Sequence, residues 1–501
     1  MPAKQPNVLL LFTDQQRADT VGALGNPVIR TPHLDRLCAE GTAFTSAYSP
    51  SPVCVPARCS LHYGQYPART GCYDNGFRMP EDGRQSFMDA LTDAGYRTHG
   101  IGKCHFTPDR DGLRGFQTRE RQEELVPSPD DDDYLKFLFD AGFDHICDPN
   151  GVRGEMYYVP QIAQMPARLH PTQWVGDRAT AFIEGQARSD GPWMLFSSFI
   201  HPHPPFAPPN PWHKLYRAPG MPLPFVPQDV ASLQTHINRF QNRYKYRDQG
   251  IDQNLLRCMK AHYYACISFI DYQVGRILGA LEAAGQLDNT LILFTADHGE
   301  LLGDYNCFGK RSMHDSCARV PLLARLPGRF AAGQVCNRPA SLVDIMPTML
   351  SAAGTDCRTH ALDGEDLAEV AAGACGREYV FSQFAKGGNA IYTAVSERWK
   401  LAYSAPDDQE YLFDRVQDPR ESRNHAGVAG YAGAQQDMRR ALTAFLRDAG
   451  EADALEGEGW KVYPRKELPR NPDAGLLVQD HPWAQTELPG YTDAAATPAR
   501  R

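Results

Sequence analysis

Residues 7–13 read Asn-Val-Leu-Leu-Leu-Phe-Thr, a short run that is apolar at almost every position. Such a run is typical of a strand buried on both faces, as strands are in a parallel sheet covered by helices. The run ends in Thr13-Asp14-Gln15. Because ligands in open α/β sheets collect at the carboxyl ends of the strands, Asp14 is well placed to hold one.

The same pattern recurs downstream. Long helical periodicity at 261–284 separates apolar runs that favour strands. The predicted strands are 41–48, 96–101, 193–199, 290–295 and 320–325. This alternation, which continues to about residue 355, predicts an α/β fold: a large, mostly parallel sheet with helices on both faces.

From about residue 376 the pattern changes to short strands in hairpin order, followed by one amphipathic helix near 434–448. The sequence therefore predicts a catalytic domain at 1–370 and a small C-terminal α+β domain at 376–465. The proline-rich, polar residues 466–501 are interpreted as an extended tail. Such a tail could wrap the body or a partner subunit, which leaves a homo-oligomer open.

Composition excludes several function classes. The 501-residue chain has a net charge of −9 and no basic run, which argues against a nucleic-acid partner. No apolar run approaches the ~18 residues of a membrane span, and the N-terminus has no signal-peptide core. The thirteen cysteines have no regular spacing, which fits reduced thiols. We expect a cytoplasmic protein without a membrane partner.

Polar residues follow several of the predicted strands, so a parallel sheet would bring them to one edge. They are Asp14, Lys103, His105, His201, Asp297 and His298.

The motif Cys54-x-Pro56-x-Arg58 lies between the first two of these segments. Pro56 suits the first turn of a helix, where its missing N–H costs nothing. Cys54 would then lie at a helix N-terminus, where free N–H groups favour negative charge, and Arg58 could fold back toward it. This is a nucleophile in positive potential, suited to an anionic ester. The alternatives are a buried structural cysteine, or half of a metal site with Cys59 that lacks a second pair at zinc spacing.

The pentapeptide resembles the signature of type I sulfatases, members of the alkaline-phosphatase-like superfamily, whose cysteine a maturation enzyme oxidises to formylglycine. The resemblance extends from Asn7 to about Asn424. It rests on Asp14-Gln15, Gly102-Lys103-x-His105, His201-x-His203, Asp297-His298 and Lys310.

This resemblance implies hydrolysis of a small-molecule sulfate monoester to an alcohol or phenol plus inorganic sulfate. It implies one divalent cation, held by Asp14, Asp297 and His298 together with formylglycine at position 54. Gln15 is a further candidate ligand.

The resemblance also implies roles for the remaining polar residues. Arg58 and Lys103 would stabilise the hydrated aldehyde. Lys103, His201 and Lys310 would hold the sulfate oxygens, and His201 or Lys310 would protonate the leaving group. His105 would then take a proton so that sulfate departs. Asn75 is a candidate contact to the transferred group.

Two departures from the common pattern affect the metal and the substrate. Many calcium arylsulfatases have Asp-Asp and Asp-Asn where this chain has Asp14-Gln15 and Asp297-His298, so one carboxylate is lost and an imidazole is added. Ca²⁺ remains the first expectation and Mn²⁺ the second. An arylsulfatase-like or choline-sulfatase-like enzyme is predicted, with aryl, choline and sugar sulfates left open. A phosphonate monoester or phosphodiester hydrolase, and an inert scaffold with unmodified Cys54, are the alternatives.

Overall fold

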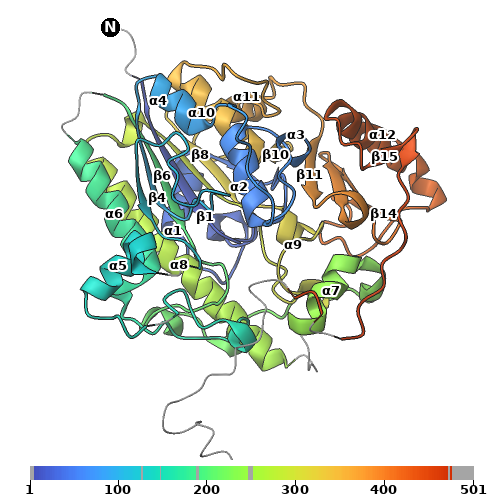
Figure 1. Ribbon diagram of the computed structural model, residues 1–501, viewed down its shortest axis with the longest axis horizontal. Coiled ribbons are helices and arrows are strands. Elements are labelled where there is room, and N and C mark those ends of the chain that lie inside the picture. Colours follow the sequence, from blue (N-terminus) through green and yellow to red (C-terminus); the bar gives the residue numbers. More distant parts are fainter. Residues whose placement is uncertain are drawn as a thin grey trace, which may run out of the picture.

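The computed structural model describes residues 5–125, 128–146, 148–187, 191–245, 252–471 and 474–476. Its centre is an eight-stranded sheet in the order β5-β4-β6-β1-β7-β8-β2-β9 (Figure 1). The five strands from β5 to β7 are parallel to one another, whereas β8 is antiparallel to both β7 and β2. The strands are β1 Asn7–Thr13, β2 Thr42–Phe44, β4 Arg97–Gly102, β5 Thr118–Arg121, β6 Trp193–Phe199, β7 Thr290–Ala296, β8 Leu322–Arg325 and β9 Gln334–Cys336.

Helices cover both faces of this sheet, because alternate side chains of the central strands point in opposite directions. Val8, Leu10 and Phe12 of β1 contribute to one apolar core, and Leu9 and Leu11 to the other. The first core also contains side chains of four helices: α2 Cys54–Tyr63, α4 Phe87–Asp93, α10 Ile345–Ala353 and α11 Leu367–Ala372. The second core contains side chains of α1 Pro32–Glu40, α5 Asp133–Asp140, α6 Pro171–Gln186 and α8 Gln253–Ala283. The predicted α/β class with a mostly parallel, covered sheet is confirmed.

A separate four-stranded antiparallel sheet follows the main body, in the order β11-β12-β13-β14. One face packs on α12, and the other contributes Ile391, Ala402 and Phe413 to a core shared with Leu301 and Met313 of the main body. These elements are β11 Val380–Phe384, β12 Ile391–Val395, β13 Trp399–Ser404, β14 Gln409–Asp414 and α12 Ala432–Asp448. The predicted run of hairpin strands followed by one helix is therefore confirmed. Of the predicted tail, residues 472–473 and 477–501 lie outside the described residues.

The remaining elements are short. They are β3 Ala47–Tyr48, β10 Ala340–Ser341, β15 Leu455–Glu456, β16 Gly459–Trp460, α3 Pro67–Thr70, α7 His236–Lys245 and α9 Asp315–Ala318. The predicted single strand at 41–48 is wrong: a turn at Thr45–Ser46 divides it, so that β2 joins the large sheet and β3 pairs with β10.

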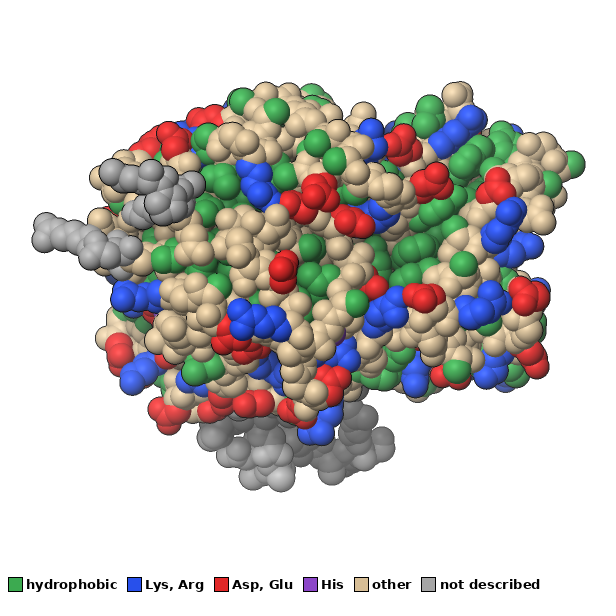
Figure 2. All heavy atoms as spheres, turned by 90° about the horizontal axis from the view of Figure 1, so that it is seen from above, with side chains coloured by type: hydrophobic (Ala, Val, Ile, Leu, Met, Phe, Trp, Pro, Cys, Tyr) green, Lys and Arg blue, Asp and Glu red, His purple; other side chains and the backbone are tan. Residues whose placement is uncertain are grey.

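Within the described part of the chain, no helix is long and apolar enough to cross a membrane. The twelve cysteines that the structure describes are free thiols. On the face shown in Figure 2, acidic and basic side chains are interspersed over the surface.

Candidate active site

Two carboxylates lie side by side because the strands that precede them are neighbours. β1 and β7 are parallel and in register, with Thr13 opposite Ala296. Asp14 and Asp297 therefore leave the sheet at the same level, and the amide N–H of Asp297 donates to the carbonyl of Thr13 at 3.2 Å. Both side chains are fully buried.

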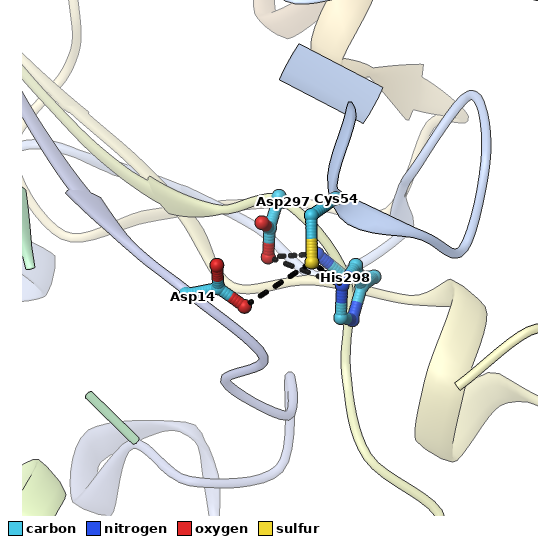
Figure 3. Close-up of side chains that lie close together, drawn as sticks. All are labelled: Asp14, Cys54, Asp297 and His298. Atoms are coloured by element: carbon cyan, nitrogen blue, oxygen red, sulfur yellow. Dashed lines mark hydrogen bonds and ion pairs between the residues drawn. The ribbon is translucent and has the colours of Figure 1, made fainter. Parts of the chain in front are cut away.

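Cys54 is the first residue of α2, and the helix directs it at the two carboxylates (Figure 3). Its sulfur lies 3.3 Å from His298 Nε2 and 3.7 Å from Asp14 Oδ1. The N-cap Val53 supplies no side-chain acceptor, but Asn75 Oδ1 accepts from the amide of Val55 at 3.0 Å. Asn75 thus stabilises the first turn of the helix that carries Cys54.

The ligand atoms of Asp14, Cys54, Asp297 and His298 all lie within 4.8 Å of one another. His298 Nδ1 is 2.9 Å from the carbonyl of Gly299, which only accepts, so Nδ1 carries the proton and Nε2 is free to bind a cation. Two carboxylates and an imidazole, with the side chain of Cys54 beside them, form a donor set that fits a divalent cation.

Gln15, next to Asp14 in the chain, offers its side-chain oxygen as a further candidate ligand for a cation. Its Nε2 donates to Glu300, while its Oε1 is buried without a hydrogen-bond partner among the described residues. A buried, unpaired amide oxygen is costly unless something binds it. Gln15 Oε1 therefore fits a cation held by the neighbouring carboxylates.

The guanidinium of Arg58 forms ion pairs with both Asp14 and Asp297. Its Nη2 lies 3.2 Å from Asp14 Oδ2, and its Nε lies 3.2 Å from Asp297 Oδ2. The guanidinium thus binds the Oδ2 atoms, whereas Asp14 Oδ1 faces Cys54. Arg58 is fully buried and also donates to the carbonyl of Lys103 at 2.6 Å.

Lys103 and Lys310 bring two ammonium groups to the same centre. Lys103 Nζ donates to Asp14 Oδ2 at 2.6 Å, and Lys310 Nζ lies 2.8 Å from the sulfur of Cys54. Gly102, at φ +86°, ends β4 where a Cβ would lie 2.0 Å from the carbonyl of Ser198, so only glycine allows this approach. The two lysines come from segments more than 200 residues apart.

These cations change the chemistry of Cys54. Burial by itself raises the pKa of the thiol, but Lys310 and then Lys103 outweigh burial and hold the pKa well below its ordinary value. A hydrogen bond from His105 adds to this lowering. Burial raises the pKa of Asp297, and the adjacent Asp14 raises it further. The site therefore favours negative charge at position 54.

The two histidines after β6 have different surroundings. His203 Nε2 is 3.0 Å from Lys310 Nζ, and its Nδ1 donates to the carbonyl of Pro204. The ring of His201 packs against His170 at 4.8 Å between centroids, and neither of its nitrogens has a hydrogen-bond partner among the described residues. Burial holds the pKa of His201 well below its ordinary value, so its ring is neutral. The structure brings His203, not His201, to Lys310.

Glu124 is a residue of this site that the sequence did not indicate. It accepts from Lys103 at 2.7 Å and from Arg153 at 2.7 Å, and lies 3.4 Å from His203 Nε2. Burial raises its pKa, but His203 and Lys103 outweigh this and hold the pKa well below its ordinary value. Glu124 lies in the irregular region after β5, where no periodicity distinguishes it from a solvent-exposed acid.

Comparison with known proteins agrees with this geometry. A family model described as "Sulfatase" matches residues 6–355, and one described as "N-sulphoglucosamine sulphohydrolase, C-terminal" matches residues 303–448. The chain is 30% identical over 488 residues to an arylsulfatase of Clostridium perfringens, covering 92% of this chain and 98% of that protein. It is also 30% identical over 490 residues to a choline-sulfatase of Rhizobium meliloti, covering 92% of each.

Among solved structures, the phosphonate monoester hydrolase of Agrobacterium radiobacter superimposes with a TM-score of 0.77 and 26% identity. The match covers 90% of this chain and 98% of that one.

Proposed function

Because the chain belongs to the sulfatase family and hydrolyses sulfate esters, we propose that Cys54, oxidised to formylglycine by a maturation enzyme, supplies the nucleophile. The observation that carries this proposal is the convergence of Asp14, Asp297 and His298 on Cys54 within 4.8 Å. Lys103 and Lys310 contribute positive charge beside them.

A divalent cation bound by Asp14, Asp297 and His298, with Gln15 as a further candidate ligand, would polarise the sulfonyl oxygens and acidify the hydroxyls at position 54. Two carboxylates and an amide oxygen suit Ca²⁺, and the imidazole makes Mn²⁺ the alternative.

The protein side chains then bind the sulfate oxygens and transfer protons. Lys103 and Lys310 hold the sulfate oxygens, and Arg58 keeps the two carboxylates fixed. The aldehyde at position 54 first adds water, which gives two hydroxyls on one carbon. One of these hydroxyls, after losing its proton to solvent, attacks sulfur, and the ester S–O bond breaks. Lys310, which contacts both Cys54 and His203, is placed to give a proton to the departing oxygen.

His105 completes the cycle. It takes the proton of the second hydroxyl at position 54, and the bond from carbon to the sulfate oxygen breaks. Inorganic sulfate leaves and the aldehyde is regenerated. We propose that His203 is the histidine that acts together with Lys310, because the ring of His201 packs on His170. Asn75, whose Oδ1 accepts from the amide of Val55, remains a proposed contact to the transferred group.

The test compares a sulfate and a phosphonate ester of the same phenol, on protein whose intact mass has been measured. Conversion of Cys54 lowers the mass by about 18 Da. We expect sulfate turnover to follow the converted fraction and to disappear in Cys54→Ala. Equal turnover by fully unconverted protein would contradict the proposed nucleophile.

A phosphonate monoester hydrolase is the second candidate, favoured by the structural similarity to the Agrobacterium radiobacter enzyme. A higher kcat/KM for the phosphonate than for the sulfate would favour it. The same comparison, extended to choline and sugar sulfates, identifies the preferred alcohol.

A further inference from the structure

A second cavity, of about 380 Å³, lies beside the segments that carry the catalytic carboxylates. Its walls include Arg17 from the loop after β1, Lys260 of α8, and Arg319 and Arg420 from later segments. Asp14, Cys54, Asp297 and His298 do not line it, so it is separate from the active site. Its volume lies within the range of cavities that bind small molecules.

The carboxylates of this cavity are already paired with cations. Arg17 binds Asp19 at 2.6 Å and Asp304 at 2.9 Å. Lys400, which lies outside the cavity lining, binds both Asp315 and Glu421. Arg17 and Lys400 supply two positive charges against these four carboxylates. Lys260, Arg319 and Arg420 add three more, so the charged groups in and beside the cavity carry one net positive charge.

Lys260 has no direct partner of this kind. The residue is 7% exposed, and among the described residues its ammonium has neither a hydrogen-bond nor an ion-pair partner. Burial lowers the pKa of Lys260 and the nearby Arg17 lowers it further, whereas Asp304 and Asp19 raise it. An ammonium that faces the cavity without a direct partner is available to an anion, which would offset the effect of burial.

Two further cations line the same cavity. The guanidinium of Arg420 lies 3.7 Å from the ring centroid of Phe225 and has no carboxylate partner in the described part of the chain. Arg319 Nε is 3.6 Å from Asp315, a carboxylate that Lys400 binds more closely at 2.7 Å. The cavity therefore combines one unpaired ammonium with two incompletely neutralised guanidiniums.

We propose that this cavity is a binding site for a small oxyanion, held by Lys260, Arg420 and Arg319. Arg17, in the same wall, donates to the carbonyls of Glu300 and Leu301, three and four residues after Asp297. Arg17 therefore connects the wall of the cavity to the segment that follows Asp297. Inorganic sulfate and inorganic phosphate share the chemistry that the site recognises.

The test is calorimetric titration of full-length protein with inorganic sulfate and, separately, inorganic phosphate, at constant ionic strength. All proteins carry Lys310→Ala, which weakens anion binding at the active site. We expect Lys260→Met to weaken the remaining binding about 10-fold and Arg420→Ala to weaken it by a similar factor. Lys136→Met, which removes an exposed lysine of α5, is the matched control and should leave the affinity unchanged. Equal affinities in all four proteins would overturn the proposal.

A second measurement does not depend on whether Lys260→Met folds. Acylation of the unsubstituted protein with acetic anhydride, followed by peptide mass analysis, reports the reactivity of each lysine. Sulfate or phosphate should slow modification of Lys260 at least about 5-fold without changing Lys136. The anion that protects at lower concentration is the preferred occupant. Modification of Lys260 at the same rate with and without both anions would contradict the site.

Discussion

The ammonium of Lys310 lies 2.8 Å from the sulfur of Cys54, although the two residues are 256 positions apart. Because Lys310 also contacts His203, it links the nucleophile to a group that can relay a proton. We expect Lys310→Ala to lower kcat for a sulfate ester about 10³-fold, since one preorganised donor is commonly worth that much. Initial rates with an aryl sulfate measure this, with Lys136→Ala as the control. A rate within threefold of the parent would remove Lys310 from its assigned role.

Arg58 is expected to be structural as well as electrostatic. It is fully buried between Asp14 and Asp297, so Arg58→Met leaves buried Asp297 without its guanidinium and Asp14 with Lys103 alone. In metal-stripped protein the free energy of unfolding should fall by about 3–5 kcal/mol. Urea denaturation measures this. Arg440→Met, at an exposed arginine of α12, should change the free energy by less than about 0.5 kcal/mol. A small effect for Arg58→Met would mean that the carboxylates find other partners.

Removal of the metal should reduce both activity and stability. The proposed ligands Asp14, Asp297 and His298 come together only in the folded state, so at a thousandfold excess over Kd a bound cation would add about 4 kcal/mol to the free energy of unfolding. We expect a chelator to abolish turnover and lower the melting temperature. Restoration by Ca²⁺ or by Mn²⁺ identifies the metal. Asp14→Asn should melt at nearly the same temperature with and without chelator, whereas a response like that of the parent would exclude Asp14 as a ligand.

Glu124→Gln tests the residue that orients Lys103 and His203. The substitution keeps the shape of the side chain but removes the charge that Lys103 contacts at 2.7 Å. Hydrogen bonds to charged groups are worth enough to predict about a 10-fold loss of kcat/KM. Steady-state kinetics measure this, with Glu184→Gln on the exposed side of α6 as the control. An unchanged kcat/KM would show that Lys103 is positioned without Glu124.

His62 should make the fold sensitive to acid. Its buried ring packs on Phe87, Phe106 and Phe196, and burial holds its pKa well below 6.5 in the folded state. Below pH 6.5 the unfolded chain binds a proton that the folded chain does not, so stability falls as pH falls. From pH 6.5 to 5.5, this residue contributes a loss of about 1 kcal/mol.

We expect the free energy of unfolding of His62→Phe to fall by about 1 kcal/mol less than that of the parent between pH 6.5 and 5.5. Urea midpoints at pH 7.5, 6.5 and 5.5 test the expectation. His213→Phe, at a half-exposed histidine, is the control. A profile as steep as that of the parent would mean that another group causes the acid sensitivity.

The sequence predicts the parts of the fold in which burial leaves a clear pattern. β1, β6 and β7 are buried along their whole length, so their apolar runs identify them to within one residue. β5, whose sequence is Thr-Arg-Glu-Arg, lies at the edge of the sheet and has no apolar pattern, so it is absent from the predicted strands. α6 begins at Pro171, after a region of weak periodicity, so its first residues give no clear helical pattern.

For the site, positions that follow from sheet topology could be predicted and positions set by loop paths could not. Asp14 and Asp297 end neighbouring strands, so a parallel sheet was enough to bring them together. His201 and His203 follow the same strand two residues apart, and only the path of the loop decides which ring meets Lys310. Glu124 enters from an irregular segment whose path the sequence does not specify.

The register of β1 against β7 also constrains how this protein folds. A slip of one residue between these strands would turn Asp297 toward the opposite helical layer, so a misaligned chain could not assemble the cation site at all. Activity therefore depends on the correct alignment of these two central strands.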